Sequence, residues 1–277
     1  MPTTTASSTA TTSRTGGVGE MLRDWREDRR RSQLDLALEV GVSTRHLSFV
    51  ETGKSKPSPE LVLAIAERLA VPLRERNSML LAAGYAPRYQ HTPLDGEALA
   101  SVRGALDQLI QAHDPFPAVV VDRHWNMVMA NPGALALTAG VAPDLAEPPV
   151  NVYRMTLHPD GMAPMIENLD EWAHHLLSTL DRQVAATRDP ELRDLLDEVS
   201  SYPNIAHIDR AWRTRSSVPT VVVPLRLRAP DGKGGTVVQS WFSTNTSIGT
   251  PADITLDELH IELFHPADAA TAAMVRG

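Results

Sequence analysis

The sequence predicts a multidomain protein in which an all-α domain of five short helices precedes an α+β domain with an antiparallel sheet. In residues 18–88, apolar side chains recur at helical spacing in short runs that end near Gly41, Gly53 and Gly84, as expected of short helices with glycine after the last turn. From Val218 onward, apolar and polar residues alternate, which is the period of half-buried strands. The length of 277 residues allows one or two domains.

Residues 33–53 carry the clearest pattern of the first domain. Helical spacing predicts a short helix whose apolar stripe consists of Leu34, Ala37 and Leu38. Gly41 follows, where a turn needs positive φ, and Ser43 can cap a second helix that ends at Glu51. Two short helices joined by such a turn are typical of a DNA-binding helix-turn-helix. The three other helices are expected at 18–31, 58–69 and 73–83.

The second domain is expected to begin after a connector rich in proline and tyrosine, residues 85–93. Helices are predicted at 94–112, 132–139, 162–183 and 190–198, with a short one after Pro266. Strands are predicted at 118–121, 125–130, 221–227, 237–244 and 259–263, with the helices on one face of the sheet. The resulting domains are a Thr/Ser-rich disordered tail (1–17), a helical domain (18–88) and an α+β domain (89–277).

Composition and charge limit the classes of function. No run of 18 apolar residues is present and residues 1–17 lack the apolar centre of a signal peptide, so neither a membrane span nor a membrane partner is expected. The chain has no cysteine, which excludes disulfides and cysteine-based zinc sites and fits a cytoplasmic protein. Residues 1–88 hold 13 basic and 10 acidic residues, a net charge of +3, whereas residues 89–277 hold 13 and 24, a net charge of −11. A basic head on an acidic body suits local contact with DNA.

The segment SQLDLALEVGVSTRHLSFVETGKSKPSPE, followed by LAVPLRERNSMLLAAGYAP, resembles the DNA-binding domain of the Cro/C1 type (xenobiotic-response-element, or XRE, family) over about residues 18–87. The resemblance implies that the third helix enters the major groove and that its base-facing residues are Thr44, Arg45 and Phe49. It implies phosphate contacts from Gln33, Ser48, Lys54 and Lys56. Arg26 and Glu51 fall where some members pair the first helix with the third, a structural role.

The second half resembles the ligand-binding domain of MmyB-like transcription regulators, a PAS-like module. The matching residues are Pro115–Asn126, Ala130-Asn131, Asn151–Arg154, Leu157–Pro159, Gly249–Leu256 and Pro266–Asp268. Over about residues 94–270, the resemblance implies a bacterial transcription regulator that senses a small apolar or fatty-acid-like molecule and needs no other cofactor. It also implies a homodimer, which suits a pseudo-palindromic operator in double-stranded DNA because one helix-turn-helix makes few base contacts.

Six residues are candidates for the effector site: Trp125, Asn131, Arg154, His158, Trp172 and Phe242. The three aromatic residues suit the wall of an apolar cavity, although plain core explains them equally well. Arg154 and His158 are the expected partners of an anionic head group, with Asn131 as a third hydrogen-bonding residue. A salt bridge that ties two elements together explains Arg154 as well as a ligand does.

No pattern predicts catalysis or a metal site, and the chain is not expected to be an enzyme. Asp122-Arg123-His124 fits a turn between two strands, and His158-Pro159-Asp160 and His174-His175 lack the spacing of a metal motif. Residues 258–262 alternate polar and apolar, which fits the two faces of a strand better than a carboxylate site. Two other interpretations stay open: the acidic second half as a protein-interaction module and, less in favour, an enzyme that acts on an apolar substrate.

Overall fold

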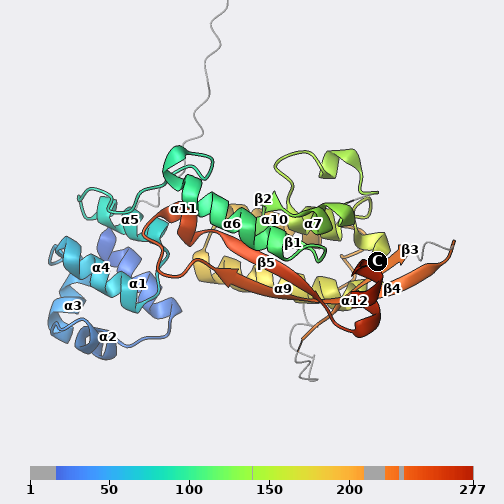
Figure 1. The fold of residues 1–277 in the computed structure, drawn as a ribbon. Helices are drawn as coiled ribbons and strands as arrows, with labels where there is room; N and C mark the ends of the chain where they lie inside the picture. Colours follow the sequence, from blue (N-terminus) through green and yellow to red (C-terminus); the bar gives the residue numbers. More distant parts are fainter. Residues whose placement is uncertain (1–16, 139, 209–221, 231–233, 277) are drawn as a thin grey trace, which may run out of the picture. The chain divides into compact units, whose positions relative to one another are not determined.

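The computed structural model describes residues 17–138, 140–208, 222–230 and 234–276, and it divides after Gln90 into two compact units (Figure 1). The tail predicted at 1–17 lies outside the described residues except for Gly17. The start of the strand predicted at 221–227 and part of the glycine-rich turn at 231–235 also lie outside them.

From Gly17 onward, where the structure describes it, the first unit consists of five helices, which confirms the predicted architecture. They are α1 (Val18–Asp28), α2 (Gln33–Glu39), α3 (Thr44–Glu51), α4 (Pro59–Arg68) and α5 (Leu73–Ala82). Three serine hydroxyls, those of Ser32, Ser43 and Ser58, accept hydrogen bonds from backbone N–H groups in the first turns of α2, α3 and α4. These caps satisfy donors that a helix leaves unpaired, so the helix starts are set locally by the sequence.

The apolar stripe predicted for α2 is wrong in part. Leu34 and Leu38 are 57% and 71% exposed, whereas Leu36 and Ala37 are each only 1% exposed. In a helix of seven residues, the buried face is decided by the neighbours that surround it. Here Leu36 and Ala37 join a core shared with α1, α3, α4 and α5, so the stripe is rotated from the one that spacing suggested.

Close contact between α1 and α3 depends on Gly19. A Cβ atom at this position would lie 2.2 Å from the carbonyl oxygen of Val50, which is far inside van der Waals contact. Glycine therefore allows the two helix backbones to approach each other. Along the same pair of helices, the guanidinium Nε of Arg26 donates to Oε1 of Glu51 at 2.7 Å, and both residues are buried. The predicted structural pair is confirmed.

The described residues of the second unit form one five-stranded antiparallel sheet. Its strands are β1 (Ala118–Val121), β2 (Met127–Ala130), β3 (Leu225–Pro230), β4 (Thr236–Ser247) and β5 (His260–Pro266). The order across the sheet is β2-β1-β5-β4-β3, and every neighbouring pair is antiparallel. The α+β prediction is confirmed, although β5 and β4 are longer than expected.

The helices of this unit differ from the predicted ones at several boundaries. They are α6 (Ala100–Ala112), α7 (Pro132–Leu137), α8 (Val152–Leu157), α9 (Leu169–Thr187), α10 (Pro190–Ser200), α11 (Ile254–Asp257) and α12 (Ala269–Arg276). Short 3-10 turns lie at Glu97–Leu99, Pro143–Leu145 and Ala163–Met165. The first and last of these turns occupy the starts of the long helices predicted at 94–112 and 162–183, and neither α8 nor α11 is among the predicted helices.

Helices cover both faces of the sheet, not one face as predicted. Ala118 and Val120 of β1 pack with Leu106 and Ile110 of α6, whereas the alternating residues Val119 and Val121 pack with α9 and α10. Figure 1 shows α6 and α9 on different sides of the strands. Because successive strand residues point to opposite faces, both sets of side chains on these strands are covered.

The start of the second unit is fastened to α11. The hydroxyl of Thr92 donates to Oδ2 of Asp253 at 2.6 Å, and the Thr255 hydroxyl donates to the carbonyl of Thr92 at 2.6 Å. Asp253 also caps α11 by accepting from the Thr255 N–H at 2.8 Å. The residues just after the division between the units are therefore held by the helix that precedes β5.

Candidate functional site

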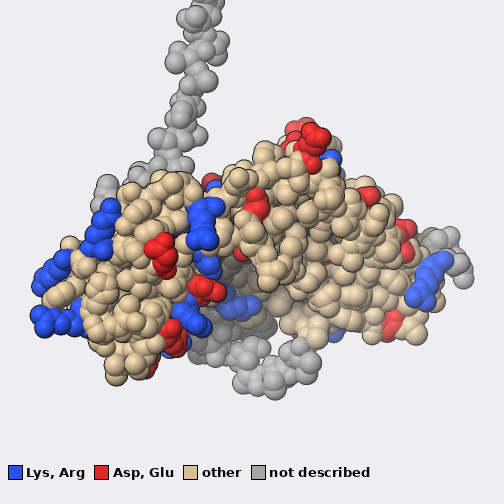
Figure 2. Space-filling model, turned by 60° about the vertical axis from the view of Figure 1, so that its left-hand side comes forward, with Lys and Arg blue, Asp and Glu red and all other residues tan. Residues whose placement is uncertain are grey.

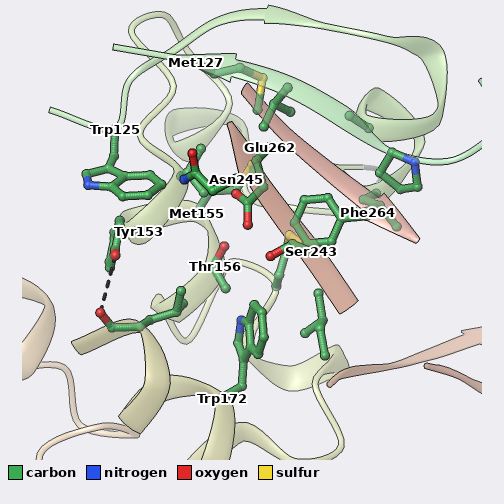
Figure 3. A pocket seen from close by; sticks show the side chains of 18 of the residues that line it. Trp125, Met127, Tyr153, Met155, Thr156, Trp172, Ser243, Asn245, Glu262 and Phe264 are labelled. Carbon is green, nitrogen blue, oxygen red and sulfur yellow. Dashed lines mark hydrogen bonds between the residues drawn. The ribbon is translucent and has the colours of Figure 1, made fainter. Parts of the chain in front are cut away.

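A cavity of about 270 Å³ lies between the sheet and helices α7, α8 and α9 (Figure 3). Its volume is close to the lower end of the range of about 300–1,000 Å³ that is usual for small-molecule sites. Most of the wall is apolar: Met127 comes from β2, Met155 from α8 and Phe264 from β5. The second unit thus contains an internal space that an apolar molecule of modest size can fill.

Two aromatic residues form one rigid corner of this cavity. The rings of Trp125 and Tyr153 meet edge to face at 5.0 Å. The indole N–H of Trp125 donates to Oε1 of Gln183 at 2.7 Å, and the hydroxyl of Tyr153 donates to the carbonyl of Leu176 at 3.3 Å. Burial raises the pKa of Tyr153, so the phenol stays neutral. Because both polar groups are used within the protein, the two rings present apolar surface to the cavity.

Three polar side chains from adjacent strands face the same cavity; we call Ser243, Asn245 and Glu262 the strand polar patch. Asn245 lies directly opposite Glu262 in the pairing of β4 with β5, and Ser243 lies two residues from Asn245 on the same face. Burial raises the pKa of the Glu262 carboxyl, and the neighbouring Ser243 hydroxyl opposes this effect. The low-polarity surroundings therefore favour the neutral, protonated acid over the carboxylate.

Other polar groups reach the cavity from the helices. Thr156 of α8 points into it (Figure 3), and His175 of α9 lines it. Burial lowers the pKa of His175, which favours the uncharged imidazole. Trp172 is 3% exposed, and its indole N–H has no hydrogen-bond partner within the described part of the chain. A buried donor without a partner is costly, so this N–H is available to an acceptor in the cavity.

The structure brings together only part of the predicted effector site. Trp125 and Trp172 line the cavity. Phe242 does not line it, because this residue precedes Ser243 on β4 and points to the opposite face of the sheet, where its ring stacks on His265 at 5.1 Å.

Asn131 has a structural position and is absent from the cavity wall. It is fully buried, and its Oδ1 accepts from the N–H groups of Ala118 and Ala134 at 2.9 Å each. Its Nδ2 donates to the carbonyls of Ile110 and Phe116. These four bonds fasten α6, β1 and α7 together and leave the amide no capacity for a ligand.

Arg154 and His158, the predicted partners of an anionic head group, also lie away from the cavity wall. Arg154 makes a two-pronged ion pair with Glu198, at 2.8 Å from Nε and 2.7 Å from Nη2. His158 packs edge to face on Tyr202 at 4.9 Å. Arg154 thus joins α8 to α10, which is the salt-bridge alternative that the sequence left open.

The sequence interpretation missed the strand polar patch. Its signal was present in the alternation of polar and apolar residues along residues 258–262, which was assigned to two strand faces. The assignment to two faces agrees with the structure, since Ile261 packs toward α6 and Glu262 faces the cavity. What alternation cannot show is that the polar face is also covered by helices.

The candidate DNA interface lies on α3 and the loop that follows it. Arg45 is exposed and its guanidinium lies 5.3 Å from the ring centroid of half-buried Phe49. Lys54 Nζ lies 5.8 Å from the same ring. The structure thus places Arg45, a predicted base-facing residue, and Lys54, a predicted phosphate contact, against the ring of Phe49. Phe49 is itself predicted to face a base. Such stacking restricts the arginine before it meets DNA.

The other residues predicted for DNA contact occupy the same unit. Thr44 is the first residue of α3, and Ser48 lies half-buried one turn later. The amide of Gln33 donates to Oε2 of Glu51 at 2.7 Å, so the buried pair orients this side chain. Lys56 is exposed, with its Nζ 4.6 Å from the ring centroid of Tyr85. Figure 2 shows Lys and Arg side chains on the surface of the first unit, with Asp and Glu among them.

Comparison with known protein families agrees with this arrangement. Residues 22–76 match the helix-turn-helix family, and residues 102–277 match the MmyB-like transcription regulator ligand binding domain. A DNA-binding helix-turn-helix followed by a ligand-binding domain defines a transcription regulator. The chain belongs to the MmyB-like transcription regulators. Both resemblances drawn from the sequence are confirmed.

A solved structure described as "Structure of an RNA-binding Light-Oxygen-Voltage Receptor" is 14% identical, with a TM-score of 0.24 over 94% of this chain and 60% of that chain. The chain thus spans about 60% of the length of that receptor. No curated protein matches. Within the described ranges, no helix has the length and apolar character needed to cross a membrane.

Proposed function

We propose that this regulator binds a specific operator as a homodimer and that a small apolar or fatty-acid-like molecule in the cavity controls its affinity for DNA. The observation that carries the proposal is the mostly apolar cavity in the same chain as a helix-turn-helix. A DNA-binding regulator acts where the chromosome lies, so we infer a cytoplasmic location. We also infer that the protein needs no cofactor besides its effector.

The DNA-binding half of the proposal is supported by the surface of α3. Arg45 is exposed there, and an arginine in the major groove can donate two hydrogen bonds to O6 and N7 of guanine. Thr44 and Phe49 lie on the same helix, and Phe49 can contact a thymine methyl group. One such helix reads only a few base pairs, which favours a two-fold dimer on a pseudo-palindromic operator.

The ligand-dependent half requires two states of the dimer. A molecule in the cavity shifts the balance between them only if it binds one state more tightly than the other. In our proposal the bound molecule changes the arrangement of the two DNA-binding domains and hence the spacing of the half-sites.

The DNA half is tested by Arg45→Ala on the full chain. Operator sequences are first selected from random DNA with the wild-type protein. The variant is expected to lose at least about tenfold in affinity for the selected operator, since one bidentate arginine–guanine contact contributes about 1–3 kcal/mol. Its affinity for random DNA should change much less.

Lys54→Ala is the matched control, because a phosphate contact contributes to all sequences alike. Competition binding with operator and random duplexes measures both variants. Equal losses of Arg45→Ala on the two duplexes would contradict the base-reading role of Arg45.

The ligand half is tested by mass spectrometry of denatured extracts of the purified chain, paired with Thr156→Phe. Thr156 points into the cavity, so a phenyl ring at this position should fill it. The wild type is expected to retain an apolar molecule and the variant to lose it. Thr138→Phe, which changes a residue outside the cavity wall, is the control and should retain the molecule. Equal retention by all three proteins would show that the cavity is not the binding site.

A further inference from the structure

Two side chains on the outer side of α3 are in contact with each other. Arg45 and Phe49 are four residues apart, so their side chains leave the helix on the same side, one turn apart. The guanidinium carbon of Arg45 lies 5.3 Å from the ring centroid of Phe49. Leu47 and Val50, which are 0% and 1% exposed, occupy the core side of the same helix. Arg45 and Phe49 therefore belong to the side of α3 that is turned away from the core.

The guanidinium of Arg45 keeps its hydrogen-bonding capacity in this contact. A guanidinium that lies over a ring uses its flat face, and its five N–H donors stay in the plane. No group in the described part of the chain accepts a hydrogen bond from these donors. The end of α3 that carries the ring is fixed, because the backbone N–H groups of Lys54 and Ser55 donate to the Phe49 carbonyl at 2.8 and 3.0 Å. Arg45 thus offers unused donors beside a ring on a fixed helix end.

The distance between the two groups limits which bases they can meet. Successive base pairs of DNA lie about 3.4 Å apart, so groups with centres 5.3 Å apart reach the same or adjacent base pairs when α3 lies in the major groove. A guanidinium pairs best with O6 and N7 of guanine, whereas a phenyl ring suits the thymine methyl group. A guanine–cytosine pair carries no methyl group in this groove. The thymine must therefore belong to a base pair adjacent to the guanine.

We propose that Arg45 and Phe49 act as one reading unit that selects a guanine directly beside a base pair containing thymine. In this unit the ring of Phe49 contacts the thymine methyl group and at the same time holds the guanidinium against guanine. The inference rests on the proposed function, because it requires that α3 lies in the major groove. It goes further by tying the two contacts to neighbouring base pairs and by making each contact depend on the other.

Selection from random duplexes with the full-length wild-type chain provides the operator. A parallel selection with Arg45→Ala identifies the guanine that the arginine reads, because the preference for guanine is lost at that position. A base pair containing thymine is expected directly beside this guanine. If the wild-type selection enriches no sequence, the proposed function itself is contradicted. If an operator is enriched that lacks thymine beside this guanine, only the reading unit is overturned.

Two changes to the DNA then test the coupling while the protein stays wild type. Deoxyuridine in place of the thymine, in one half-site, removes only the methyl group and should weaken binding about fourfold, as expected for one buried methyl group. 7-Deazaguanine in place of the guanine removes the N7 acceptor and should weaken binding about tenfold. Together they should weaken it about tenfold, because a guanidinium without its guanine no longer holds the ring against the methyl group. A combined loss of about fortyfold would mean two independent contacts and overturns the proposal.

Phe49→Ala assigns the methyl contact to the ring. This variant should bind the thymine and deoxyuridine duplexes with equal affinity, and an undiminished preference for thymine overturns the proposal. Phe49→Leu keeps an apolar side chain but no ring for the guanidinium, so it should retain a preference for the methyl group and lose the coupling. His46→Ala, which changes an α3 residue outside the stack, is the control and should show the wild-type pattern. Circular dichroism verifies that each variant is folded.

Discussion

At the scale of single residues, the environment of a side chain in the sheet changes from one position to the next. Ile261 packs against the α6 side, and its neighbour Glu262 faces the cavity. Burial raises the pKa of this glutamate, so the protein interior disfavours its ionised form. Its ionisation therefore opposes folding of the empty protein, which makes the stability depend on pH.

Glu262→Gln is expected to stabilise the ligand-free protein at high pH and to have little effect at low pH. The pKa of Glu262 in the folded protein lies above its ordinary value of 4.5, so below about pH 4.5 the side chain is neutral in both the folded and unfolded states. As pH rises through the window between the two pKa values, the unfolded state ionises first and wild-type stability falls. Each unit of pKa difference corresponds to about 1.4 kcal/mol.

Chemical denaturation of wild type and variant at pH values between 4.5 and 8 measures this difference. The signal to monitor is the unfolding transition of the second unit. A gain in stability that is the same at every pH would mean that ionisation of Glu262 is not its cause.

The candidate ligand site could be predicted only in part from single residues. Trp125 and Trp172 were selected as large aromatics, and both line the cavity. Asn131 and Arg154 are predicted as polar partners of a ligand's head group, but each bonds to elements distant in sequence. Such bonds depend on tertiary placement, which residue type and spacing do not contain.

At the scale of elements, α1 and α3 are joined by the buried pair of Arg26 and Glu51, which also holds Gln33. A buried charge is costly when its partner is removed. Gly19, in contact with the backbone of Val50, allows the helices to come close enough for this pair to form.

Glu51→Ala is expected to lower the free energy of unfolding of the first unit by up to about 3–5 kcal/mol, because breaking a buried ion pair leaves the guanidinium of Arg26 with only the Arg31 carbonyl at 2.9 Å and the Glu27 carboxylate at 3.4 Å. Glu51→Gln should cost less, since the amide oxygen can still accept from Arg26. Glu39→Ala, which removes an exposed ion pair with Arg31, is the matched control and should cost less than about 1 kcal/mol.

Urea denaturation followed by far-ultraviolet circular dichroism on the full chain measures all three variants. Equal effects of Glu51→Ala and Glu39→Ala would contradict the structural role of the buried pair.

Element prediction succeeded where local signals are strong. The serine caps of α2, α3 and α4 were visible in the sequence and mark their starts. The six-residue helix α8 was missed, although the Asn151 side chain caps it by accepting from the N–H groups of Tyr153 and Arg154. A helix this short is stabilised by packing more than by its own periodicity, and Tyr153 and Leu157 are almost fully buried.

At the scale of the whole molecule, the two parts of the chain differ in net charge, which is +3 for residues 1–88 and −11 for residues 89–277. The expected phosphate contacts include only two cations, Lys54 and Lys56, while Gln33 and Ser48 are uncharged. Affinity for DNA should therefore depend only modestly on salt, since counterion release follows the number of phosphates neutralised.

The logarithm of the DNA association constant is expected to fall with the logarithm of salt concentration with a slope of about −2 for each bound domain, hence about −4 for a dimer. Lys54→Ala should reduce the steepness by about 1 per domain. Titrations of operator DNA at several salt concentrations provide the slope. A slope as steep as about −10 would mean that many more cations meet the backbone than the surface of α3 provides.

The attachment of Thr92 to α11 has a mechanical consequence. Helix α11 ends at Asp257 and β5 begins at His260, so the segment that connects them is short. This segment joins the helix that holds Thr92 to the strand that carries Glu262. A molecule that pushes β5 along its axis must either compress this short connection or pull on Thr92, two residues beyond the division between the units. The chain leading to the DNA-binding helices is thus tethered to the same strand that bears the acid of the cavity.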